Sequence, residues 1–115
     1  MFTGIVQDIG KVKDIKDGIE EIIFETSLDL TECKIGSSIS CDGICLTVTT
    51  IQKLQNDNFL FSVNVGEETK KRTNALFWNK MSLVNLEKSM KMGDEISGHF
   101  VYGHVDTTFK ITKIE

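Results

Sequence analysis

Short segments with strand-like patterns, separated by glycine and asparagine turns, occupy most of this chain and limit the folds open to it. Strands are predicted at residues 5–15, 19–26, 39–41, 44–51, 59–65 and 82–87. Turns are predicted at Asp17–Gly18, Asp42–Gly43 and Asn56–Asn58. Residues 67–77 are the best candidate for a helix. This pattern predicts an all-β protein, either a sandwich or a barrel, and a barrel is favoured because closure removes exposed strand edges.

The size and charge of the chain narrow the possible functions. Its 115 residues suffice for one domain with a buried core. No apolar stretch is long enough to span a membrane, and MFTGIVQDIG lacks the basic flank and apolar core of a secretory signal, so a cytoplasmic location is expected. Thirteen basic against seventeen acidic residues argue against nucleic-acid binding, which needs a basic face.

The sequence contains a short internal repeat. GIVQDIGKVKDI at 4–15 aligns with GHVDTTFKITKI at 103–114, and the identical pairs are Gly4/Gly103, Val6/Val105, Lys11/Lys110 and Ile15/Ile114. One interpretation is that a second copy of the domain starts here. The other is that two similar amphipathic strands belong to one barrel, and the repeat by itself leaves both open.

The segment SSISCDGICLTVTT at 37–50 holds two of the three cysteines. If Asp42–Gly43 is a two-residue turn, Cys41 faces Ile44 and Ser40 faces Cys45 across the hairpin, and opposed residues share a face. One face then carries Ile39, Cys41, Ile44, Leu46 and Val48, and the other carries Ser38, Ser40, Cys45, Thr47 and Thr49. The apolar face is expected in the core. The polar face is either a solvated outer wall or a ligand site with several short donors and acceptors.

No metal site is expected. Cys41 and Cys45 on opposite faces cannot bind one metal ion or form a disulfide without breaking the hairpin. His99 and His104 are five residues apart, which places them on opposite sides of a strand or about 140° apart around a helix. Without an export signal, reduced thiols are the expectation.

Five segments together resemble the riboflavin synthase family. They are MFTGIV at the start, GSSISCDGICLTVT at 36–49, ETKKRTN at 68–74, VNLE at 84–87 and GHFVYGHVD at 98–106. The resemblance is to the first of the family's two tandem lumazine-binding barrels and runs through nearly the whole chain. It implies a six-stranded antiparallel Greek-key closed barrel with one or two short helices. It also implies a first repeat at 1–97, followed at 98–115 by the first strand of a truncated second repeat.

The resemblance implies a transferase reaction. The family's enzymes move a four-carbon unit between two molecules of 6,7-dimethyl-8-ribityllumazine, which gives riboflavin and 5-amino-6-(ribitylamino)uracil, with no metal or organic cofactor. A methyl group of the donor loses a proton and the carbanion attacks the acceptor, so the protein would orient two stacked pterins and transfer protons. Each family site lies between the first barrel of one subunit and the second barrel of its neighbour. The implied assembly is a homotrimer for a full-length enzyme and a dimer for the 115-residue chain. The chain alone would show little enzymatic turnover. Lumazine synthase is a further implied partner.

Site residues follow from the same resemblance. The implied pterin-binding residues are Gly4, Ile5, Val6, Cys45, Leu46, Thr47, Asn64, Val65, Gly66, Glu67, Glu68, Thr69, Gly103, His104 and Val105. The implied catalytic residues are Ser38, Cys45, His104 and Phe2. Thr47 and the backbone of 64–69 would hydrogen-bond the pteridine, Cys45 and Ser38 would assist addition or proton transfer, and His104 is a candidate acid/base. Ser38, Cys45 and Thr47 are also the residues that the hairpin pattern placed on one face.

Departures from the family and alternative functions complete the sequence picture. NKMS at 79–82 stands where the family has a glycine-aspartate turn, and Lys70 and Lys71 replace a leucine and an arginine, which leaves the structure of this turn and of the helix end open.

One alternative function is a non-catalytic lumazine or flavin carrier of the same fold. Another is an oligonucleotide-binding barrel, against which the charge balance argues.

Overall fold

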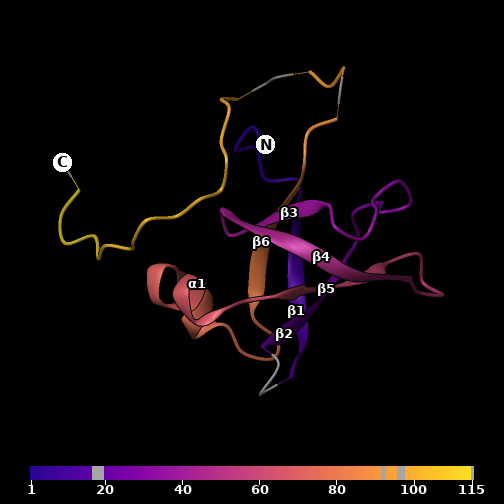
Figure 1. Ribbon diagram of the computed structural model, residues 1–115, viewed down its shortest axis with the longest axis horizontal. Helices are drawn as coiled ribbons and strands as arrows, with labels where there is room; N and C mark the ends of the chain where they lie inside the picture. The colour runs from indigo at the N-terminus through magenta and orange to yellow at the C-terminus, as the bar shows by residue number, and fades with distance from the viewer. Residues whose placement is uncertain (17–19, 92, 96–97, 115) are drawn as a thin grey trace.

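The computed structural model describes residues 1–16, 20–91, 93–95 and 98–114 (Figure 1). In this part of the chain six antiparallel strands close into a barrel in the order β1-β2-β5-β4-β3-β6. The strands are β1 (Asp8–Lys16), β2 (Glu21–Thr26), β3 (Ser38–Cys41), β4 (Ile44–Lys53), β5 (Phe59–Asn64) and β6 (Leu83–Lys88). Because β6 returns to lie beside β3, the order β6-β3-β4-β5 is that of a Greek key. The predicted fold class is confirmed, with a barrel rather than a sandwich.

Alternate side chains of the strands fill the barrel interior. Phe24 of β2 and Phe61 of β5 are opposed in register, and their rings stack with centroids 5.2 Å apart. Trp78, which lies between β5 and β6 in the chain, packs edge-on against Phe24 at 5.6 Å. These three aromatic side chains are buried and anchor the core, because each removes a large apolar surface from water.

The β3–β4 hairpin has the predicted register. Ser38 pairs with Thr47, Ser40 with Cys45, and Cys41 with Ile44. Asp42 and Gly43 have φ angles of 52° and 83°, as a two-residue turn of this type requires. The turn near Asn56–Asn58 is also present. The predicted Asp17–Gly18 turn lies outside the described residues.

The helix predicted at 67–77 is interrupted. It consists of α1 (Glu67–Arg72) and a 3-10 turn, η1 (Asn74–Phe77), with Thr73 extended between them at φ −133° and ψ 176°. The Thr73 hydroxyl donates to the Thr69 carbonyl at 2.7 Å and accepts from the Ala75 N–H at 3.1 Å. One side chain therefore ends the first helix and caps the second.

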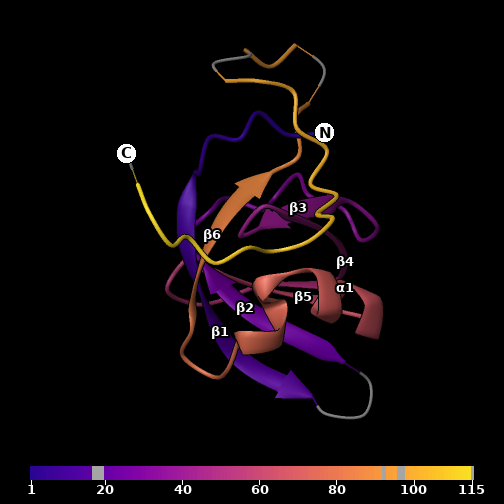
Figure 2. The ribbon, with the colours of Figure 1, turned by 90° about the vertical axis from the view of Figure 1, so that its left-hand side faces the viewer.

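The two terminal segments lie together against the outside of the barrel. Phe2 and Val101 form an antiparallel bridge, with backbone hydrogen bonds of 2.7 and 2.8 Å. The His99 N–H donates to the Thr3 carbonyl at 2.9 Å. Residues 4–7 connect this bridge to β1, which starts at Asp8 rather than at residue 5 as predicted. Figures 1 and 2 show the chain continuing from this bridge past α1 to its C-terminal end.

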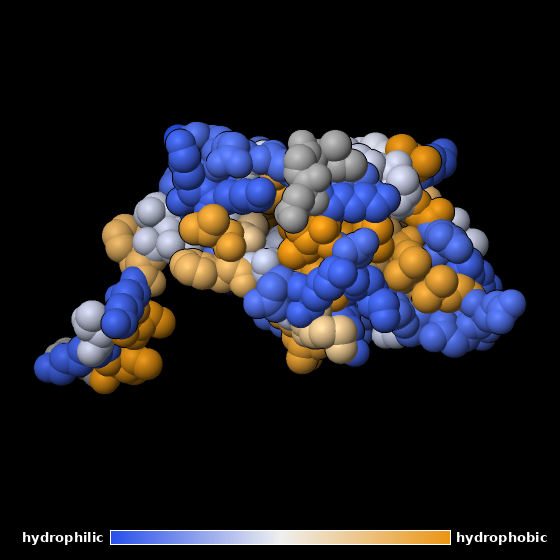
Figure 3. All heavy atoms as spheres, turned by 90° about the horizontal axis from the view of Figure 1, so that it is seen from below, coloured by the Kyte–Doolittle hydropathy of each residue, from blue (hydrophilic) through white to orange (hydrophobic). Residues whose placement is uncertain are grey.

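The segment after the bridge carries exposed apolar side chains. Phe109, Ile111 and Ile114 are each at least three-quarters exposed, and Figure 3 shows apolar side chains on this protruding segment at the lower left. Through 102–114 the structure assigns no strand or helix. Among the described residues, no helix has both the length and the apolar character needed to cross a membrane.

Candidate functional site

The outer face of the β3–β4 hairpin is the polar one, as its sequence predicts. Thr47 is exposed, while Ser38 and Cys45 are half-buried. On the inner face Cys41 is fully buried, so burial, with smaller contributions from Asp42 and Cys45, raises the pKa of its thiol far above the usual range. Cys41 is therefore a core residue that stays protonated, and Cys45 is the thiol that faces outward.

A strap formed by residues 99–105 crosses this outer face at Cys45. The Cys45 N–H donates to the Gly103 carbonyl at 2.8 Å. Gly103 has φ +80°, and a Cβ atom placed on it would lie 2.8 Å from the Cys45 Cβ and 2.9 Å from the Cys45 nitrogen. Glycine is required here for two reasons, the backbone angle and the close approach.

A cleft of about 150 Å³ lies between β4, α1 and the strap. Its lining residues are Ile44, Cys45, Glu68, Thr69, Arg72, Thr73, Gly103, His104 and Val105. An open hollow of about 510 Å³ lies along the same strap, lined by Gly43 and residues 100–105. The cleft is smaller than the roughly 300–1,000 Å³ of typical small-molecule pockets, so it forms part of a site rather than a complete pocket.

The cleft brings together three of the four predicted ligand-binding segments. Cys45 comes from β4, Glu68 and Thr69 from α1, and residues 103–105 from the strap. Glu68 accepts a 2.7 Å hydrogen bond from Arg72 within α1, which places an ion pair at the rim of the cleft. The neighbouring Asn64, Gly66 and Glu67 are exposed.

Other predicted residues do not line this cleft. Leu46 and Val65 point into the core, so they could offer a ligand only main-chain groups. Ser38 and Thr47 form the pair that follows Ser40 and Cys45 on the outer face of the hairpin, and the Ser38 carbonyl accepts from the Ser89 hydroxyl.

The fourth predicted segment lies on the opposite edge of the strap. A Cβ atom placed on Gly4 would lie 3.6 Å from the Val101 side chain, and Ile5 and Val6 are about half exposed. Phe2 has 1% of its surface exposed, so its side chain is buried rather than presented to solvent. The N-terminal segment thus flanks the strap, and Cys45 lies beneath the strap's far end.

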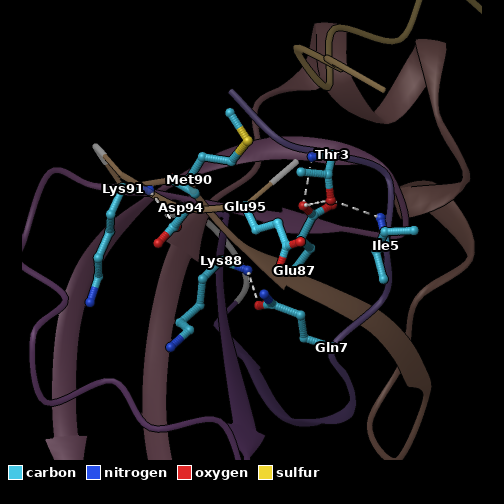
Figure 4. A pocket seen from close by; sticks show the side chains of 10 residues that line it. Thr3, Ile5, Gln7, Glu87, Lys88, Met90, Lys91, Asp94 and Glu95 are labelled. Carbon is cyan, nitrogen blue, oxygen red and sulfur yellow. Dashed lines mark hydrogen bonds between the residues drawn. The ribbon is translucent and has the colours of Figure 1, made fainter. Parts of the chain in front are cut away.

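Two carboxylates that organise this region were missed by sequence reasoning. Asp42 accepts hydrogen bonds from the Asn85 N–H, the Asn74 amide and the Trp78 indole, at 2.8 to 3.2 Å. Glu87 accepts from Thr3 and Gly4 and is visible in Figure 4 reaching toward Thr3. The one sequence feature that could have pointed to them is their position within two segments that resemble the family, GSSISCDGICLTVT at 36–49 and VNLE at 84–87.

The cleft region offers hydroxyl, thiol, imidazole and main-chain groups. Within residues 1–16, 20–91, 93–95 and 98–114, no group of three or more His, Cys, Asp or Glu side chains is arranged to hold a metal ion. The groups that converge at Cys45, Thr69 and His104 are suited to hydrogen bonding and proton transfer with an organic ligand.

Comparison with known proteins gives a consistent set of relatives. A family model described as "Lumazine binding domain" matches residues 3–89. Riboflavin synthase of Brucella abortus is 40% identical over 98% of this chain and 57% of its own length. Riboflavin synthase of Bacillus subtilis is 41% identical over 100% of this chain and 52% of its own length. The chain therefore spans about half the length of these curated relatives.

Solved structures with the same fold were also found. The structure of LumP complexed with riboflavin superposes with a TM-score of 0.68 at 23% identity, over 93% of this chain and 56% of LumP. LumP complexed with 6,7-dimethyl-8-(1'-D-ribityl) lumazine gives 0.66 at 22% identity, over 93% of this chain and 58% of that one. At this identity the likeness concerns the fold.

Proposed function

Because the chain belongs to the lumazine-binding domain family, we propose that it binds 6,7-dimethyl-8-ribityllumazine and riboflavin on the barrel wall around Cys45. The observation that carries this proposal is the cleft in which Cys45, Thr69 and His104 converge from β4, α1 and the strap. Those residues come from separate parts of the sequence, and the family resemblance implies a ligand contact for each of them.

The proposed activity is that of riboflavin synthase, with this chain as its first barrel. Relatives about 40% identical across nearly the whole chain support it. Two lumazine molecules would exchange a four-carbon unit, and a second barrel from a neighbouring subunit would hold the second molecule. Residues 98–115 would then be the start of a second repeat, an assignment supported by the repeat between 4–15 and 103–114. The incomplete cleft at Cys45 fits a site that a second barrel completes.

The proposed roles follow from position. Thr47 and the main chain of 64–69 would bind the pteridine edge, because Thr47, Asn64 and Gly66 are exposed near the cleft. Cys45 would assist addition, and His104 would accept or return the proton of the reacting methyl group. Phe2 would act through its backbone pairing with Val101, which fixes the strap, because its side chain is buried.

The proposal is tested by titrating the purified chain with the lumazine and following ligand fluorescence. Saturable binding that riboflavin competes for is expected. Cys33→Ser is a suitable control, since Cys33 is half-buried and does not line the cleft. The proposal would be rejected if the ligand fluorescence stayed unchanged at concentrations high enough to saturate a small-molecule site.

Cys45→Ser separates binding from chemistry. Serine keeps the size of the side chain but is a far weaker nucleophile, so lumazine affinity should stay largely intact. Turnover, measured as riboflavin formation by an assembly that includes a second barrel, should fall. Equal losses of affinity and turnover would contradict this division of roles. Lumazine binding without riboflavin formation by any wild-type assembly would instead favour a non-catalytic carrier.

A further inference from the structure

Glu87 is an acidic side chain held almost out of solvent on the outer wall of the barrel. Only 5% of its surface is exposed. It lies on β6 opposite Ser40 of β3, and Ser40 is in turn opposite Cys45 of β4. Because opposed residues share a face, Glu87, Ser40 and Cys45 form one row across the outer wall.

The Glu87 carboxylate holds the N-terminal segment. Oε2 accepts from the Thr3 N–H at 2.7 Å and from the Thr3 hydroxyl at 3.0 Å. Oε1 accepts from the Gly4 N–H at 3.0 Å, and Figure 4 shows the carboxylate beneath Thr3. These hydrogen bonds to a charged acceptor offset the cost of burying the carboxylate.

The N-terminal segment in turn holds the strap. Phe2 exchanges two backbone hydrogen bonds with Val101, and the Thr3 carbonyl accepts from the His99 N–H. Two residues after Val101, the Gly103 carbonyl accepts from the Cys45 N–H. Glu87 is therefore connected to Cys45 by hydrogen bonds to Thr3, from the N-terminal segment to the strap, and from the strap to Cys45.

We propose that Glu87 is a positioning residue of the lumazine site. Its carboxylate fixes Thr3 and Gly4, and the backbone of Phe2 and Thr3 in turn fixes the strap above Cys45. The ligand part of this inference rests on the proposed function, whereas the anchoring part concerns the protein alone. A carboxylate that only stabilised the barrel would affect unfolding without selectively loosening the N-terminal segment and the strap.

The test compares Glu87→Gln with a matched control. Glutamine has the same shape, but its amide nitrogen cannot accept, so the N–H donors of Thr3 and Gly4 face one acceptor oxygen instead of two. Glu25→Gln is the control, because Glu25 is a partly buried carboxylate of the same wall that accepts from Asn58 and pairs with Lys13. Thr3→Ala is a milder second variant, which removes the hydroxyl donor and is informative if Glu87→Gln does not fold.

Amide hydrogen exchange and lumazine titration are measured on the whole 115-residue chain. In Glu87→Gln the Thr3, Gly4, Val101 and Cys45 amides should exchange about tenfold faster, with strand β5 unchanged, and the lumazine Kd should rise about tenfold. Thr3→Ala should give smaller changes in the same amides. Glu25→Gln should lower the melting temperature without changing either readout.

Each contrary result has a defined meaning. Unchanged exchange at Thr3 and Gly4 in Glu87→Gln would overturn the anchoring role. Faster exchange with an unchanged Kd would overturn the positioning role while leaving the anchor in place. If the wild-type chain bound no lumazine, the proposed function would fall and with it the ligand part of this inference, and the exchange data would still decide whether Glu87 holds the segment.

Discussion

At Gly103 a single absent side chain determines how closely the strap approaches β4. Any Cβ atom at this position would collide with both the side chain and the main chain of Cys45. The contact also needs a positive φ angle, which side chains disfavour. The half-buried state of Cys45 therefore depends on the residue that crosses it as well as on its own strand.

Gly103→Ala should separate the strap from β4. We expect a loss of about 1–2 kcal/mol from the backbone angle and about 1–3 kcal/mol more from the collision. The Cys45 thiol should react severalfold faster with a thiol reagent, because the displaced strap no longer covers it. The measurement is made in a Cys33→Ser background, where the other remaining thiol, Cys41, is buried and protonated.

Gly36→Ala is the control for the backbone angle alone. Gly36 has φ +94°, and a Cβ atom there would meet nothing within 4 Å. This variant should lose only the roughly 1–2 kcal/mol that comes from the backbone angle, and it should leave Cys45 reactivity unchanged. Equal thiol reactivity in the two variants would show that the close approach does not shield Cys45.

Among the elements, the β3–β4 turn connects the barrel to the helical segment. The Asp42 carboxylate accepts from the backbone of Asn85 in β6 and from the side chains of Asn74 and Trp78 around η1. The turn thereby fixes the connection between β5 and β6 as well as its own hairpin. The helical segment that follows α1 is held to the barrel in part by this one side chain.

Asp42→Ala should destabilise the protein by about 2–3 kcal/mol, since it removes three acceptor contacts and places alanine at a positive φ angle. Asp42→Asn should cost only about 1 kcal/mol, because asparagine tolerates that angle and keeps one acceptor oxygen. Urea unfolding followed by fluorescence of Trp78, the single tryptophan in the sequence, measures both. Equal losses in the two variants would contradict the role given to the carboxylate.

The sequence patterns were sufficient for these local elements and insufficient for the contacts between distant ones. The register of β3–β4 followed from a two-residue turn and the alternation of side chains, both of which are local. The helix break was missed because Thr73 is defined by its hydrogen bonds to Thr69 and Ala75 rather than by composition. Glu87 was missed because its partner Thr3 is 84 positions away and no periodicity relates the two.

For the molecule as a whole, closure of the barrel depends on β1, which pairs with both β2 and β6. At the start of β1 the Asp8 carboxylate accepts from the Thr26 hydroxyl at 2.6 Å and from the N–H and hydroxyl of Ser27 at 3.0 and 3.1 Å. Burial tends to raise the pKa of Asp8, but these hydrogen bonds together outweigh it and hold the pKa below its ordinary value.

This lowered pKa predicts a contribution to acid stability. The ionised carboxylate stabilises the folded state above pH of about 4, and that stability is lost as the pH falls through the lower pKa of the folded protein. Asp8→Asn should be less stable than wild type at neutral pH, and the difference should shrink in the acid range. Urea unfolding at a series of pH values tests this, and a difference that is independent of pH would refute it.

The anchoring of Thr3 by Glu87 also has a consequence for the order in which parts of the chain fold during synthesis. At about 5–20 residues per second, the ribosome adds the 84 positions between them in roughly 4 to 17 s. Through that interval the N-terminal segment has no docking partner, and the Phe2 side chain, 1% exposed in the folded protein, is open to water or to chaperones. Phe2 and Thr3 thus reach their places only after the much later residues Glu87 and Val101 have been made, and the wall around Cys45 is completed at the same late stage.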